Sequence, residues 1–314
     1  MVRISGRSFP TPAVVMTSVD PAVSDQLRGF AAVQAVEANA ALGVLDAELG
    51  RAGSRAERVA GFEAAYRHVA EWRYQLALEG KWVRPGASAD DVRAPIEHAM
   101  YYRLSPAIGQ REPGSPAYKL LTELEQVALE RLDGQHELQN VVTLRDGRTV
   151  NGNILHFVPA RNDEVTQRFF PDGLPDEVRT QTSGPEDREV LRRASFEALA
   201  ELEEADADPK NPEHRQTFTD AAYFLVQGPE YQRGSDAIMR TFLAAAHTRV
   251  FDAAPVLPQA IDLDGMVRGQ EGFNRVLHDQ LRIAPKAPAA QQTNAATAAA
   301  VRPARSTRPN GLSR

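Results

Sequence analysis

The residues best placed to do chemistry lie in one stretch, Gly228-Pro-Glu-Tyr-Gln-Arg-Gly-Ser-Asp-Ala-Ile-Met-Arg240. An apolar helical segment runs into this stretch and an amphipathic one leaves it, so Gly234 and Ser235 stand where the second helix should begin. A glycine-containing loop that leads into a helix N-terminus can present backbone N–H groups and a positive dipole end to an anion. Arg233 and Arg240 lie on either side of the turn. We therefore predict an anion-binding site formed by Arg233, Gly234, Ser235 and Arg240.

Metal and nucleophile chemistry find little support in the residue types. The chain has no cysteine, which excludes disulfides, cysteine nucleophiles and thiolate metal sites. Its seven histidines are scattered without an i,i+4 pair, and His136-Glu137 is not followed by the second histidine of the zinc-protease motif. Neither a P-loop, a G-x-G-x-x-G fingerprint nor a G-x-S-x-G elbow occurs. We therefore predict no metal site.

A second constellation concerns ADP-ribosyl transfer, which uses an arginine, a Ser-Thr-Ser-like strand and a Glu-x-Glu pair. Arg103, Thr182-Ser183, Glu201 and Glu203 follow that order along the chain. The two glutamates lie in a helical pattern, and the sequence does not predict the strands that should flank them. A divergent ADP-ribosyltransferase remains an alternative, and it predicts Glu203 at a nicotinamide pocket.

Charge and hydropathy restrict the classes of partner. The net charge of −6 and the pI of about 5.7 argue against general nucleic-acid binding by the whole chain. No apolar run approaches the roughly 18 residues that a membrane span needs, and no hydrophobic signal region follows the N-terminus. We expect neither a membrane span nor Sec-dependent export.

The elements that position these residues are mostly helical. Apolar residues at helical spacing, together with capping residues and Pro or Gly at the ends, predict a series of helices. They are expected over about 20–50, 54–80, 91–104, 115–134, 183–202, 212–227, 235–250 and 264–281. One β-hairpin is predicted from Val141 to Asn153 around Asp146-Gly147, continuing to Pro159. The fold class is therefore mainly α, a multi-helix bundle with one β-hairpin.

Composition also divides the chain. Residues 1–19 are predicted to be a flexible N-terminal segment, similar to a non-cleaved effector secretion signal or simply frayed. An N-terminal helical region follows over 20–135, and a helical core with the hairpin covers 136–283. Residues 284–314 are Ala, Pro, Gln and Thr with five cations and no acid, so a disordered basic tail is expected.

The region 141–251 resembles the Fic/Doc/AvrB-like family, whose core is a helical bundle bearing a β-hairpin flap. The family motif, His-Pro-Phe-x-x-Gly-Asn-Gly-Arg-x-x-Arg, joins two core helices. The hairpin and the helix through Ala221-Ala222 to Gln227 look like the flap and the helix that enters the motif. In the motif itself, Gly234 matches the first glycine and Arg240 the last arginine, while Ser235 stands at the asparagine.

Departures from the motif decide what the resemblance implies. Pro229, or Gly228 if the alignment is shifted by one residue, stands at the catalytic histidine. Asp236 stands at the second glycine and Ala237 at the first motif arginine. In the family the histidine is the general base that activates the target hydroxyl. Its loss should lower nucleotidyl transfer on the order of 10²–10⁴-fold. The resemblance therefore implies a fold that is kept and a reaction that is altered.

The resulting hypothesis is an effector-like protein that binds a nucleotide or another phosphorylated ligand at Arg233–Ser235, and a host or target protein. The hairpin, with Val141, Thr143, Val150 and Gly152, would dock an extended segment of the target by edge-strand pairing. Delivery to a host cell without a Sec signal is implied by the resemblance to bacterial effectors. The other alternative is a non-catalytic helical interaction protein, which predicts no deep anion pocket around Gly234.

Overall fold

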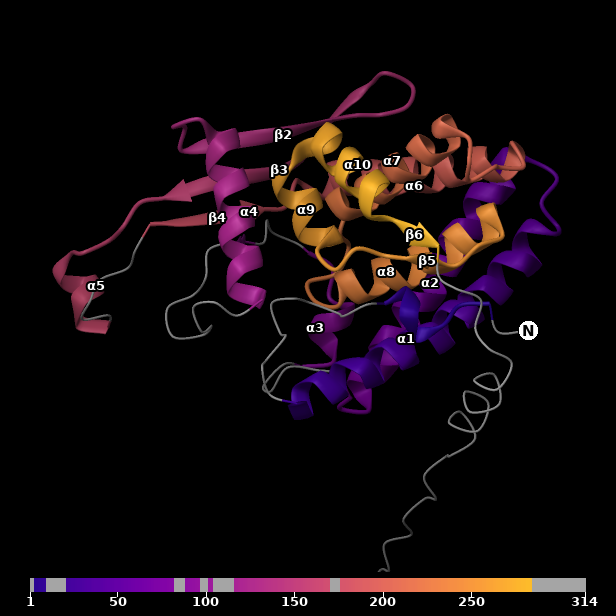
Figure 1. The fold of residues 1–314 in the computed structure, drawn as a ribbon, viewed down its shortest axis with the longest axis horizontal. Helices are drawn as coiled ribbons and strands as arrows, with labels where there is room; N and C mark the ends of the chain where they lie inside the picture. The colour runs from indigo at the N-terminus through magenta and orange to yellow at the C-terminus, as the bar shows by residue number, and fades with distance from the viewer. Residues whose placement is uncertain are drawn as a thin grey trace, which may run out of the picture.

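Figure 1 shows the chain as a computed structural model, which describes residues 3–9, 21–81, 88–96, 101–103, 116–169 and 176–283. Two long helices, α1 (Pro21–Leu49) and α2 (Arg55–Leu78), form an antiparallel pair at the base of the view. The sequence Ser54-Arg-Ala-Glu57 predicts a capping box at the start of α2, and the structure confirms it. The Ser54 hydroxyl accepts the Glu57 backbone N–H at 3.3 Å, and the Glu57 carboxylate accepts the Ser54 backbone N–H at 2.9 Å.

Three further helices complete the bundle: α6 (Pro185–Glu204), α7 (Pro212–Gln227) and α8 (Ser235–Phe251). The core holds Tyr66, Phe196 and Phe242, whose ring centroids lie 5.6 to 5.8 Å apart in tilted or edge-to-face contacts. One hydrophobic core includes residues of α1, α2, α6, α7 and α8. It therefore crosses the predicted division between 20–135 and 136–283.

A four-stranded antiparallel sheet lies beside the bundle, with the strand order β1-β4-β3-β2. The predicted hairpin is confirmed as β2 (Glu137–Thr143) and β3 (Thr149–Val158), with a register shift between Gln139 and Val141. The two other strands are β4 (Glu177–Gln181) and β1 (Tyr101–Arg103). Helix α4 (Pro116–Leu132) packs on the sheet through a second apolar cluster, whose buried members are Leu124, Ala128, Leu132, Leu155, Val178 and Val267.

Two sequence predictions around this sheet are wrong. The helix expected over 91–104 is only α3 (Asp90–Arg93), because Pro95 disfavours a helical Ala94, whose ψ is 124°. Strand β1 follows in its place. From the sequence we expect residues 162–184 to form a polar loop without regular structure. This segment instead contains α5 (Glu164–Phe169) and β4, and β4 pairs with both β1 and β3.

The C-terminal part also differs from its prediction. The helix expected over 264–281 is two helices, α9 (Ile261–Val267) and α10 (Gly269–Gln280), which meet at Gly269 with a φ of +67°. That left-handed conformation interrupts the helical backbone. Helix α6 begins after Gly184 rather than after a capping Ser183. A small sheet joins β5 (Pro255–Val256) to β6 (Arg282–Ile283).

The N-terminus is packed where it is described. Residues 3–9 include a short 3₁₀ turn, η1 (Gly6–Ser8), and the side chains of Ile4 and Phe9 are buried in the bundle core. The Asn39 amide binds the backbone of Arg3 and Ile4, so the prediction of a frayed end is wrong for these residues. Residues 10–20 and the predicted tail 284–314 lie outside the described residues. Among the described helices, none is both long and apolar enough to cross a membrane.

Candidate functional site

The predicted loop joins α7 to α8, as expected from its sequence. Helix α8 begins at Ser235, directly after Gly234, which adopts a φ of 79°. A left-handed residue at this position favours glycine because it has no Cβ to clash with its own backbone. A Cβ on Gly234 would also lie 3.1 Å from Arg73 Cγ and 3.3 Å from Val92 Cγ1, so protein atoms of α2 and α3 fill the space beside it.

An extended segment after α3 covers the middle of the loop. The Ile96 amide donates to the Glu230 carbonyl at 2.9 Å, and the Gln232 amide donates to the Ala94 carbonyl at 3.0 Å. These two hydrogen bonds form an antiparallel bridge that closes one side of the loop. The loop backbone is therefore held by other parts of the protein.

Arg240 takes a structural position. Its side chain is 3% exposed, and its guanidinium donates to Asp236 at 2.6 Å and to Asp262 at 2.9 Å. It also donates to the carbonyls of Pro258 and Gln259, both at 2.7 Å. Because four of the five guanidinium N–H groups are used in this way, Arg240 ties α8 to the start of α9 and offers little to a ligand.

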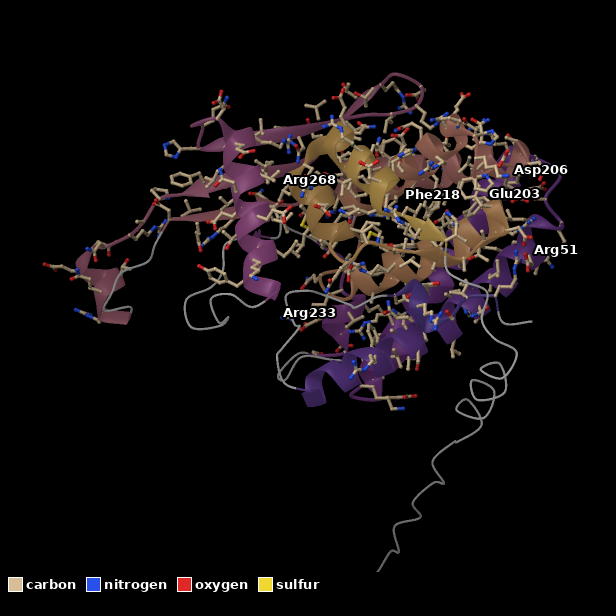
Figure 2. The ribbon with its side chains drawn as sticks, viewed as in Figure 1. Arg51, Glu203, Asp206, Phe218, Arg233 and Arg268 are labelled. Carbon is tan, nitrogen blue, oxygen red and sulfur yellow. The ribbon has the colours of Figure 1, made fainter. Side chains whose placement is uncertain are left out.

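Arg233 and Ser235 differ in what they leave available. The Arg233 side chain is 47% exposed and lies beside α3, where its Nε is 3.3 Å from an Asp91 carboxylate oxygen. Figure 2 shows it on the lower side of the bundle, away from β2 and β3. The Ser235 hydroxyl donates to the Tyr231 carbonyl at 2.7 Å, so it does not cap α8. The N-cap residue Gly234 has no side chain, so it provides no side-chain cap to the first turn of α8.

Pro229, which the resemblance places at the base position, has no titratable side chain. The neighbouring Glu230 forms an ion pair with Arg67 of α2. Arg67 also donates to the Tyr231 hydroxyl at 3.0 Å, and burial raises the pKa of Tyr231. Sequence reasoning missed Arg67, because nothing in the chain pattern of α2 marks which loop it faces. These contacts fix the loop and supply no general base.

The hairpin meets the beginning of this loop rather than its end. The Gln227 side chain accepts the backbone N–H of Asn153 at 2.7 Å and donates to the backbone carbonyl of Gly265 at 2.7 Å. A Cβ on Gly152 would lie 2.5 Å from Gln227 Oε1, so only glycine allows this close approach. Gly152 is therefore a packing residue between the hairpin and the end of α7.

The outer edge of β2 is the other predicted feature. Strand β2 is the last strand of its sheet, and Val141 is 57% exposed. At Thr143, the Gln270 side chain accepts the backbone N–H and donates to the backbone carbonyl, both at 2.9 Å. The outward N–H and C=O of Thr143 are thus occupied as a neighbouring strand would occupy them. Of the other predicted hairpin residues, Val150 is half-buried opposite Val142.

The residues of the ADP-ribosyl alternative do not converge on one site. Glu201 and Glu203 both lie within α6. Glu203 accepts from Arg249 of α8 at 2.5 Å, and burial raises its pKa. It sits at the end of the bundle far from β4, the strand that precedes Thr182 (Figures 1 and 2). Within the described ranges, no group of three or more His, Asp or Glu residues is placed to hold a metal ion.

Comparison with known proteins adds no identity. The chain matches no protein-family model, and no curated protein matches it significantly.

Proposed function

We propose that this chain is a non-catalytic, effector-like interaction protein that binds an extended segment of a partner protein along the outer edge of β2. The observation that carries the proposal is the contact of Gln270 with Thr143. A side-chain amide that satisfies one backbone position of the edge shows that this backbone faces outward. This supports pairing of a partner strand with the neighbouring outward positions of β2.

In an antiparallel ladder, residues whose backbone groups bond to the neighbouring strand alternate with residues whose backbone groups point away from it. This alternation identifies the residues of β2 whose N–H and C=O groups face outward. Leu144 donates its amide to Arg148 at 2.8 Å within the hairpin, so Leu144 faces inward and Thr143 faces outward. Val141, two residues earlier, then also faces outward. The His136 carbonyl accepts the Phe157 amide at 2.9 Å, which places Glu137 and Gln139 outward on the other side of the register shift.

The side chains beside this edge specify the chemistry of the partner. Glu137, Gln139 and Val141 all lie on the exposed face of β2. Cross-strand pairs favour opposite charges and apolar or β-branched neighbours. The partner strand should therefore carry Lys or Arg opposite Glu137 and a β-branched or aromatic residue opposite Val141. Backbone hydrogen bonds would supply affinity, and these two positions would supply specificity.

Selection from a displayed library of random 12-residue peptides tests this proposal. Wild-type protein should enrich peptides with a cation about four residues from a β-branched or aromatic residue. The Val141→Pro variant, which removes an outward N–H, should enrich none of them. A second pair of variants provides a matched control. Val141→Lys places a cation on the edge of β2, whereas Val36→Lys places one at an exposed valine of α1, away from the edge, and should leave enrichment unchanged. Equal enrichment by wild type and Val141→Pro would contradict the proposal.

A second candidate function, binding of a nucleotide or phosphorylated ligand, is favoured by the uncapped start of α8. Amides of a first helical turn attract phosphate groups, and the exposed guanidinium of Arg233 lies next to them. Asp91 and Asp236 oppose this binding, because both place negative charge near the same turn. Arg240 is left out of this proposed site on account of its buried carboxylate contacts.

Calorimetric titration with ATP, UTP, GTP and nucleotide sugars tests the second candidate. Binding should weaken with Arg233→Ala and should strengthen with Asp91→Asn, which frees the guanidinium. An absence of heat with every ligand, for wild type and for Asp91→Asn alike, would remove this candidate and leave the edge proposal untouched.

Delivery to a host cell belongs to the same proposal and is supported only by the resemblance of residues 141–251 to effector domains. A translocation reporter fused to the full chain would test it. Signal in recipient cells that depends on the donor's secretion system is the expected result, and signal that persists without that system would contradict it.

A further inference from the structure

A pocket of about 200 Å³ opens between the hairpin turn and helix α6. Its deepest lining residues are apolar: Leu144, Ala194, Ala198 and Phe224. Of these four, Ala194 is the most exposed, at 9%. A cavity of about 150 Å³ lined by apolar side chains is large enough for a benzene ring. The pocket can therefore receive one aromatic ring or a group of similar size.

The rim of this pocket is charged, and its acidic members are already bound by arginines. The contacts are Glu201 with Arg145 at 2.6 Å, Glu197 with Arg193 at 3.0 Å, and Asp146 with Arg148 at 2.7 Å. Arg145 is held on its other side by Asp220 at 3.4 Å. These pairs neutralise the acids of the rim and limit what most of the arginines can offer to a ligand.

Arg55 is the exception among the rim cations. Its contacts with described residues are all long: 3.5 Å to the Glu197 carbonyl, 3.5 Å to Glu201 and 3.9 Å to Glu204. Its side chain is 52% exposed, yet its backbone is fixed because it is the first residue of α2. A guanidinium with only long contacts gains most from a carboxylate at hydrogen-bond distance.

We propose that this pocket binds a small aromatic monocarboxylate, with the ring over Ala194 and the carboxylate at Arg55. The volume of the pocket admits one ring, and the ring would lie against the side chain of Ala194. A single negative charge suits the rim better than a doubly charged phosphate, since the carboxylates of Asp146, Glu197 and Glu201 also line it. This site is separate from the start of α8 and from the edge of β2.

A ligand-observed ¹⁹F NMR titration with 4-fluorophenylacetate tests the proposal on the full chain. A ligand of this size should bind with a dissociation constant on the order of 1 mM. Arg55→Gln should weaken binding about tenfold, which is the worth of a charge-assisted contact. Arg51→Gln is the matched control, because Arg51 is exposed, pairs with Glu48 and does not line the pocket. The Arg51→Gln variant should bind the ligand as tightly as the wild-type protein.

Two further measurements locate the ligand. Ala194→Val should abolish binding by filling the pocket, and the neutral 4-fluorophenylacetamide should bind at least five times more weakly than the acid. Equal affinity for acid and amide, or unchanged affinity in folded Arg55→Gln, would overturn the proposal. Loss of binding in Arg233→Gln but not in Arg55→Gln would also overturn it, because the anion would then lie at the start of α8.

Discussion

Replacing Arg240 with methionine separates a structural role from a ligand-binding one. Methionine keeps the length of the side chain and removes the guanidinium, so Asp236 and the carbonyls of Pro258 and Gln259 lose their donor in a region where Arg240 itself is almost fully buried. Removing one partner of a buried ion pair costs about 3–5 kcal/mol. With an unfolding entropy of about 2.1 cal/mol/K per residue, this corresponds to a fall in Tm of roughly 5–10 °C.

Urea denaturation followed by circular dichroism measures this loss as a shift in midpoint at unchanged slope. Arg233→Gln is the control, because an exposed pair such as that with Asp91 contributes less than about 1 kcal/mol. Adding Asp236→Asn to Arg240→Met should restore part of the stability by removing the uncompensated charge. A loss of less than about 1 kcal/mol in Arg240→Met would refute the structural role and return Arg240 to the set of possible anion contacts.

Three other changes probe the bundle and the hairpin. Burial raises the pKa of Glu37 to about 8, so the folded state holds this proton and stability falls as pH rises from about 5 to 8. Glu37→Gln should remove on the order of 2 kcal/mol of that fall, measured by urea titrations at several pH values. The effect stays below the full shift because the His68 ring, whose Nε2 lies 2.9 Å from the Glu37 carboxylate, can donate a hydrogen bond to the ionised form. Burial lowers the pKa of His247 to about 4, so stability should be lost as pH falls from about 6.5 to 4, by roughly 3 kcal/mol, and His247→Gln should flatten this acid limb. Gly152→Ala should destabilise the protein by about 1–3 kcal/mol in thermal melts, because its methyl group displaces the Gln227 amide; an unchanged melt would show that the hairpin does not depend on that contact.

Local sequence signals predicted the parts of the fold that local forces decide. Three local signals predicted element ends that the structure confirms: Ser54 at the start of α2, Asp146-Gly147 at the turn between β2 and β3, and Gly234 before the start of α8. Strands β1 and β4 escaped prediction because short polar segments become strands only through pairing with residues distant in sequence. The break at Gly269 was likewise hidden inside a continuous apolar pattern.

In the candidate site, too, the features set by local sequence were predicted and those set by distant contacts were not. Gly234 stands at the helix start that its sequence predicted, with the left-handed backbone that favours glycine. The role of Arg240 could not be read from the chain, because its partner Asp262 lies 22 residues away and is brought near only by the packing of α9 against the bundle. Gln270 was missed for a similar reason, since its contact with Thr143 spans 127 residues.

Amide hydrogen exchange across β2 tests the central proposal most directly. In the free protein the Val141 amide should exchange fast and the Thr143 amide slowly, because Gln270 already accepts the latter. Gln270→Ala should make the Thr143 amide fast, and a peptide selected on the wild-type protein should make the Val141 amide slow. A Val141 amide that is slow in the free protein, or that stays fast with saturating peptide, would contradict binding at the edge of β2.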